Sequence, residues 1–277
     1  MIRLYHSRLY YLTVRRGIRR LTPAGRIYVL LAALSFVLGL VWLTDTVSGL
    51  LQDMKSSARL KELQAVQAQA ALAGQDAALT VPGPSILPGL APLYEQNPEL
   101  AGWLTIEGTL IDYPVLYSPE DEDFYLSHNF DQEPDKNGSL LIQAGCDPYT
   151  PGGNIIIHGH NLKNGLMFAS LINYRDEAYF REHPLIRYST LYEQGKYEIV
   201  AVFLTQVYKK SDNVFKYYHF FGADTPAEFN DFYDNIKALA LYDTGVEAQF
   251  GDRFITLSTC AYHVENGRLA VVARAVK

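Results

Sequence analysis

Residues Ile255–Val276 read "ITLSTCAYHVENGRLAVVARAV" and place one of the chain's two cysteines between two β-rich runs. Both runs carry the β-branched and apolar residues that strands favour. Arg268 stands eight residues after Cys260, so two antiparallel strands joined by a loop would return the arginine to the cysteine's end of the sheet. A guanidinium so placed could stabilise an oxyanion that develops when a thiolate attacks a carbonyl.

Similar short runs, separated by turn residues, occur along the chain from residue 102 onwards. Several short strands at modest spacing predict a β-sandwich or a β-barrel rather than a doubly wound sheet. The other runs span residues 102–117, 138–143, 154–159 and 185–208.

One helix interrupts this β-rich pattern, at "TPAEFNDFYDNIKALALY", residues 225–242. Thr225 is the predicted N-cap, Pro226 occupies the first helical position, and Glu228 completes a capping box. Apolar residues then recur at spacings of three and four. The sequence therefore predicts a helix of about four turns, inserted directly before the strand that leads to Cys260.

The N-terminus is basic and precedes a long apolar segment. Residues 1–26 contain seven arginines and no acidic residue, whereas the remainder carries 17 basic and 30 acidic residues, a net charge of −13. So acidic a body argues against nucleic acid as a partner. Ile27–Thr44 holds no charged residue, and a helix of that length is about 27 Å long, close to the hydrocarbon thickness of a bilayer. It predicts a single membrane span, and the positive-inside rule places the N-terminus in the cytoplasm.

These patterns divide the chain into four parts. We expect a cytoplasmic N-terminus at 1–26, a transmembrane signal anchor at 27–46, an extracellular stalk and linker at 47–89, and a folded domain at 90–277. The linker prediction rests on "TVPGPSILPG", residues 80–89, whose prolines and glycines end any helix.

The thiol and the histidines leave several interpretations open. Cys260 could form a disulfide with Cys146, or it could be an inert thiol. A reactive thiol needs an imidazole, and "NIIIHGHNLKNGLMF" offers His158 and His160 at a strand end. The two histidines with Cys260 could also bind zinc. His263 lies nearer in sequence, but it would have to fold back over its own loop, so we expect it to be exposed.

At this point the residues resemble a known family. "TLSTC", ending at Cys260, then Arg268, and "HGHN" at residues 158–161 about a hundred residues earlier, resemble the sortases. Their cysteine ends a "TLxTC" strand and their histidine lies in a "GH" turn. The blocks at 97–115 and 159–168 and the inserted helix resemble class B sortases in particular, since class A enzymes lack that helix.

The resemblance implies a closed eight-stranded β-barrel and a membrane-anchored transpeptidase that needs no metal or other cofactor. It assigns the nucleophile to Cys260, the acid and base to His160, and the oxyanion donor to Arg268. His158 stands where class B members commonly have tyrosine. Leu126 and Ser258 are the predicted substrate contacts, and Glu122 replaces an asparagine found in some relatives.

The implied partners are surface proteins that bear a C-terminal sorting signal, cut after threonine, and an amine of a peptidoglycan precursor. Two enzymatic alternatives use the same residues, namely a cysteine protease and a pilin polymerase. A third alternative is a surface metal-binding or structural protein with an inert Cys260.

Overall fold

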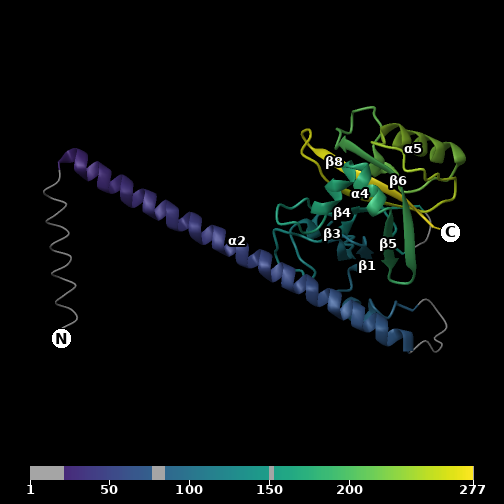
Figure 1. Cartoon of the computed structure of the whole chain (residues 1–277), viewed down its shortest axis with the longest axis horizontal. Coiled ribbons are helices and arrows are strands. Elements are labelled where there is room, and N and C mark those ends of the chain that lie inside the picture. Colours follow the sequence, from purple (N-terminus) through teal and green to yellow (C-terminus); the bar gives the residue numbers. More distant parts are fainter. Residues whose placement is uncertain (1–21, 77–84, 150–152, 277) are drawn as a thin grey trace. The chain divides into compact units, whose positions relative to one another are not determined.

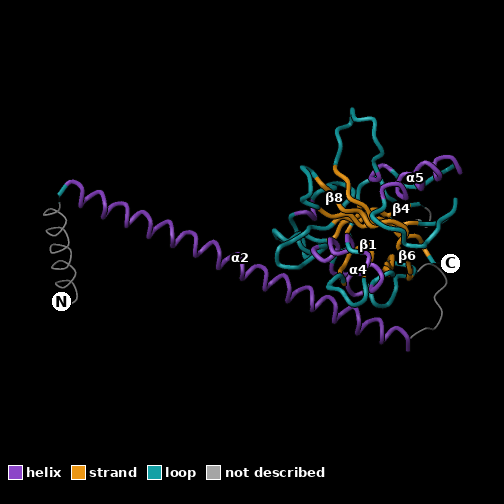
Figure 2. Tube along the Cα trace, turned by 45° about the horizontal axis from the view of Figure 1, so that its top comes forward, coloured by secondary structure: helices purple, strands orange, loops and turns teal. Residues whose placement is uncertain are grey.

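The computed structural model of the chain describes residues 22–76, 85–149 and 153–276. Eight strands close into a barrel in the order β1-β2-β3-β4-β7-β8-β6-β5, and helices and loops surround them (Figures 1 and 2). The predicted mainly β fold and its closed eight-stranded barrel are confirmed. The strands are β1 Leu100–Thr105, β2 Asp112–Leu116, β3 Leu140–Ile142, β4 Asn154–His158, β5 Leu185–Thr190, β6 Gln194–Gln206, β7 Phe254–Cys260 and β8 Gly267–Ala275.

Alternation along the last two strands separates the barrel interior from its outer surface. Ile255 and Leu257 of β7 join Leu269 and Val271 of β8 in the main core. The alternate residues face the other way, where Phe254 packs in another cluster with helix α5 (Pro226–Leu239). Because side chains alternate along a strand, Ser258 and Cys260 share the outer face with Phe254.

Helix α5 spans Pro226–Leu239, and its N-cap Thr225 accepts a hydrogen bond from the backbone N–H of Glu228. The predicted inserted helix is therefore present, with its predicted cap. Phe229, Phe232 and Ile236 are buried against the outer surface of the barrel. The shorter helices are α3 Ala91–Gln96 and α4 Glu177–Glu182, with 3-10 helices η1 Phe124–Leu126, η2 Ala169–Arg175 and η3 Tyr217–His219.

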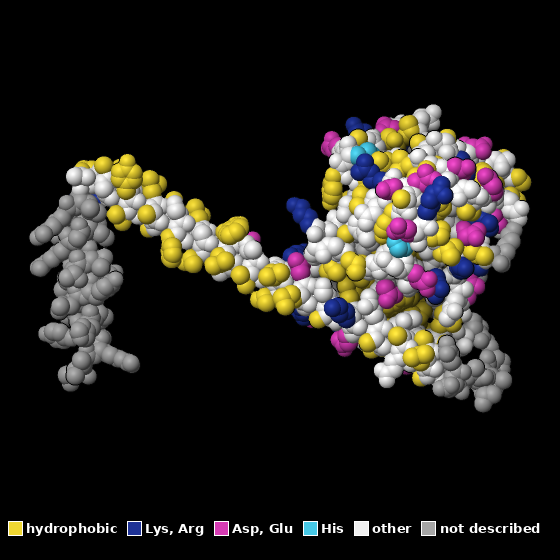
Figure 3. All heavy atoms as spheres, viewed as in Figure 1, with side chains coloured by type: hydrophobic (Ala, Val, Ile, Leu, Met, Phe, Trp, Pro, Cys, Tyr) yellow, Lys and Arg dark blue, Asp and Glu magenta, His cyan; other side chains and the backbone are white. Residues whose placement is uncertain are grey.

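Helix α2 spans Pro23–Asp76. Its first part is long and apolar enough to cross a membrane, and Figure 3 shows hydrophobic side chains along it. Val29, Leu34 and Trp42 are among its exposed large apolar residues. In water such a surface would be unfavourable, whereas in a bilayer it would contact lipid.

The folded unit begins earlier than the sequence indicates. The chain separates into two compact units, residues 1–52 and 53–277, whereas we expected a stalk to continue to residue 89. The difference lies in residues 53–76 of α2. Leu63 is fully buried in a cluster with Leu90, Leu93 and Trp103. The segment is rich in Ala and Gln, so its few large apolar residues, such as Leu63, did not indicate in the sequence that it packs against the folded domain.

Candidate active site

Strand pairing brings Cys260 and Arg268 together. Strands β7 and β8 are antiparallel, and Cys260 is the direct partner of Arg268 at the last position of the register. Side chains of directly opposite residues project to the same face, with Cβ atoms about 4.5–5.5 Å apart. Cys260 and Arg268 therefore leave neighbouring strands on the same face at one rim of the barrel, and Nη1 of Arg268 donates to the Gly267 backbone oxygen at 3.1 Å.

His160 reaches the same rim from strand β4. This strand runs parallel to β7, with His158 in register with Ser258, and His160 follows its end by two residues. The His160 Nε2 atom lies 2.8 Å from the backbone oxygen of Leu126. A carbonyl oxygen only accepts hydrogen bonds, so Nε2 is the donor, and Nδ1 is the ring nitrogen left for another partner.

A cleft of about 330 Å³ unites the residues singled out from the sequence. Its walls include Cys260, His160 and Arg268, and also the two predicted substrate contacts, Leu126 and Ser258. The remaining residues that line the cleft are Glu122, Asp123, Leu141, Gln143, Ala144, His158, Gly159 and Thr259. A thiol, an imidazole and a guanidinium at one cleft can together attack a carbonyl, exchange its protons and stabilise its oxyanion.

Ser258 forms the buried floor of this cleft. It is 1% exposed, and its Oγ lies 2.6 Å from the phenol oxygen of Tyr217. Burial raises the pKa of Tyr217 to about 12, so the phenol stays protonated at neutral pH. Nothing in the sequence pattern marked Tyr217, because it lies in the loop between β6 and α5, about 40 residues from Ser258.

His158 lines the cleft but differs from His160 in its surroundings. Burial, together with the positive charge of Arg268, lowers the pKa of His158 to about 4. Its Nε2 lies 2.9 Å from the side-chain oxygen of Gln143, whose amide nitrogen donates to the backbone oxygen of Tyr218. At neutral pH His158 is therefore an uncharged hydrogen-bond donor in the wall of the cleft.

Hydrogen bonds from side chains to backbone oxygens join the ends of the parallel strands β4 and β7. The Asn161 side chain donates to the backbone oxygen of Cys260 across 3.0 Å, and the Thr259 hydroxyl donates to that of Gly159 across 2.8 Å. These bonds hold the His160 turn against the cysteine strand. Asn161 directly follows the Gly-His pair in the sequence, which is the one local signal that could have marked it.

The structure also addresses the other interpretations of the cysteines and histidines. Both cysteines are free, so the disulfide alternative is not realised, and Cys146 is buried. Burial raises the pKa of the Cys146 thiol to about 11. Among the described residues, no group of three or more His, Cys, Asp or Glu side chains is placed to hold a metal ion. His263 is exposed, as expected.

A closed barrel with a strand-end thiol paired to an arginine is the architecture of a cysteine transpeptidase, and comparison with known proteins gives the family. The chain belongs to the sortase family, since the model of the sortase domain matches residues 104–276. Sortase B of Listeria monocytogenes is 34% identical over 206 residues, which cover 73% of this chain and 80% of the relative. Sortase B of Staphylococcus aureus is 28% identical over 194 residues, covering 69% and 76%.

Solved structures agree with this assignment. A crystal structure of sortase B from Bacillus anthracis, in complex with AAEK1, matches with a TM-score of 0.67 and 28% identity. The match covers 82% of this chain and 99% of that structure. Sortase B of Clostridium perfringens matches with a TM-score of 0.60 and 26% identity, covering 68% and 99%. The predicted resemblance to class B sortases is confirmed, and the chain is a cysteine transpeptidase.

Proposed function

We propose that this transpeptidase cuts a C-terminal sorting signal after threonine and transfers the surface protein to an amine of the cell wall. The pairing of Cys260 with Arg268, in one cleft with His160, is the observation that carries the proposal. We further propose that Ile27–Thr44 anchors the enzyme in the cell membrane, with the N-terminus in the cytoplasm and the barrel outside.

The reaction begins with attack on the threonine carbonyl. The Cys260 thiolate forms a bond to the carbonyl carbon, and the oxygen takes the negative charge. Arg268 donates hydrogen bonds to that oxygen from the neighbouring strand. When the tetrahedral intermediate collapses, the C–N bond breaks and His160 supplies the proton that the departing amine needs. The product is a thioester between Cys260 and the threonine.

The second half repeats these steps in reverse. An incoming amine attacks the thioester, His160 takes its proton, and the C–S bond breaks to return the Cys260 thiolate. Water in place of the amine would make the enzyme a protease. The contact between His160 and the Leu126 carbonyl supports this use of His160, because it orients the ring while leaving Nδ1 to exchange protons.

The test uses the full chain in detergent micelles and a library of fluorogenic peptides that vary around a central threonine. We expect cleavage after threonine, and hydroxylamine should convert the product from the free acid to the hydroxamate. His160→Ala should lower turnover by about 10² to 10⁴. His263→Ala, an exposed histidine, serves as the matched control and should leave turnover unchanged. Absence of cleavage throughout the library would refute the proposed reaction, and an unchanged free-acid product would favour the protease.

A further inference from the structure

The backbone oxygen that contacts His160 belongs to Leu126, directly before a loop that forms hydrogen bonds and ion pairs with helix α2. The loop comprises residues 127–139, between η1 and β3. Its two ends stay close together, because Asp135 donates its N–H to the Ser127 oxygen at 2.8 Å and Ser139 donates to the Tyr125 oxygen at 2.8 Å. Leu126, whose oxygen contacts His160, lies directly before this loop. Any movement of the loop therefore acts on the His160 contact.

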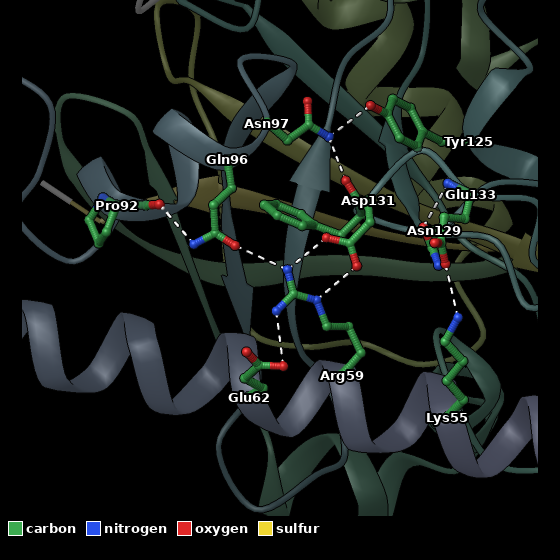
Figure 4. Close-up of polar contacts among 11 residues, drawn as sticks. Lys55, Arg59, Glu62, Pro92, Gln96, Asn97, Tyr125, Asn129, Asp131 and Glu133 are labelled. Carbon is green, nitrogen blue, oxygen red and sulfur yellow. Dashed lines mark hydrogen bonds and ion pairs between the residues drawn. The ribbon is translucent and has the colours of Figure 1, made fainter.

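Helix α2 binds the loop through a charged pair at one end. Two nitrogens of the Arg59 guanidinium, Nε and Nη2, donate to the two oxygens of the Asp131 carboxylate, at 2.8 and 2.6 Å. Nη2 also donates to Gln96 at 3.0 Å, and Lys55 pairs with Glu133 at 3.1 Å. Figure 4 shows Arg59 and Lys55 extending from the helix toward Asp131 and Glu133 of the loop. A two-point arginine–carboxylate contact fixes orientation as well as distance.

A second set of contacts centres on Asn137, which is 1% exposed. Its side-chain nitrogen donates to the Asp53 carboxylate at 3.2 Å and lies 3.3 Å from the Ser56 hydroxyl. Ser56 in turn donates to Asp135. Burial alone would raise the pKa of Asp53, but donors on Asn137, Lys136 and Asn164 outweigh it and lower that pKa. The helix thus meets the loop with a network of charge-assisted hydrogen bonds.

The same asparagine reaches the other side of His160. The Asn164 amide donates to the Asn137 side-chain oxygen at 3.0 Å. Asn164 lies in the turn that follows His160, and this turn is closed by a hydrogen bond from the Phe168 N–H to the His160 oxygen at 2.9 Å. Asn137 therefore connects α2 to both segments that hold His160, namely the loop after Leu126 and the turn 161–167.

We infer that Ser56 of helix α2, with Asn137 and Asn164, forms a positioning relay that fixes the His160 ring for proton transfer. The inference rests on the proposed role of His160 as acid and base. The buried Asn137 amide donates through its nitrogen to α2 and accepts at its oxygen from Asn164, so few other orientations would satisfy its hydrogen bonds. Without the helix contact, the loop and the turn that bonds to it through Asn164 could shift together relative to the cleft, and the ring would lose its fixed position there.

The experiment compares Ser56→Ala and Asn164→Ala with the wild-type full chain in detergent micelles. Ser48→Ala is the matched control, because Ser48 lies on the same helix and its hydroxyl donates to the backbone oxygen of Asp45 at 2.8 Å. For a peptide cleaved by the wild type, each relay variant should lower kcat about 2- to 10-fold, the size of one hydrogen bond, with KM little changed. Ser56→Thr, which keeps the hydroxyl, should restore kcat.

Hydrogen–deuterium exchange of the same proteins separates this inference from the proposed function. We expect faster exchange in segments 127–139 and 160–168 for Ser56→Ala and Asn164→Ala, but not for Ser48→Ala. Faster exchange with an unchanged kcat, or unchanged exchange, would overturn the relay. A wild-type protein that cleaves no peptide would refute the proposed function instead, and exchange would then still decide whether α2 restrains the His160 turn.

Discussion

Leu63 provides the sharpest test of where the folded domain begins. Its side chain is fully buried among Leu90, Leu93 and Trp103, although the sequence places it in a predicted stalk. Truncating a leucine in such a site to alanine costs about 2 to 5 kcal/mol of stability. For a domain of about 150–250 residues, each kcal/mol lowers Tm by about 2 to 4 °C. Leu63→Ala should therefore lower Tm by about 4 to 20 °C.

The assay is thermal unfolding of the full chain in detergent, followed by near-ultraviolet circular dichroism. Leu72→Ala is the matched control, because Leu72 lies on the same helix and is 66% exposed. It should melt within about 2 °C of the wild type, since substitutions at exposed sites usually change stability by less than about 0.5 kcal/mol. Equal melting of the two variants would refute the docking of α2 on the barrel. A protein that begins at Leu90 should likewise be less stable than one that includes Asp53–Asp76.

Three further predictions concern the cleft. Because the His158 pKa of about 4 lies below the usual value near 6.5, the unfolded chain binds that proton more readily. His158 therefore makes the free energy of unfolding depend on pH. Its contribution is fully present above about pH 6.5 and falls by at most about 3 kcal/mol as the pH drops towards 4. His158→Gln should remove this component from urea unfolding at pH 7 and 4.5, and equal pH dependence would contradict it. Arg268→Ala should lower kcat/KM for peptide cleavage by about 10² to 10³, with Arg268→Lys intermediate; a wild-type rate in either variant would exclude an oxyanion role. Tyr217→Phe should destabilise the fold by about 1 to 3 kcal/mol in urea unfolding, because it leaves the buried Ser258 hydroxyl without this partner, and an unchanged midpoint would show the contact to be dispensable.

Local patterns predict much of the barrel. Thr225, Pro226 and Glu228 mark the start of α5 because a cap acts within one turn of its own helix. Alternating β-branched residues likewise mark β7 and β8. Cys260 and Arg268 could be paired from sequence, because a short loop joins their antiparallel strands and fixes the approximate register.

Contacts between distant segments could not be predicted in the same way. The parallel pairing of β4 with β7 brings His160 near Cys260 across a hundred residues, and only the family resemblance indicated it. Tyr217 begins the short 3-10 helix η3 and Asn137 lies in a loop, and at neither position does the local sequence pattern indicate the partner of the side chain. The docking of Leu63 depends on a surface that exists only once the barrel has closed.

Intact-mass spectrometry tests the central claim most directly. The wild-type full chain, incubated with a cleavable threonine peptide, should gain the mass of the fragment that ends in threonine less one water, as expected for an acyl group bound through a thioester. Peptide mapping should place this adduct on Cys260, and hydroxylamine should remove it, because a thioester is readily attacked by a nitrogen nucleophile. Cys260→Ala should gain no mass and cleave no peptide. An adduct on Cys146, or peptide cleavage by Cys260→Ala, would contradict a thioester on Cys260 as the intermediate of this enzyme.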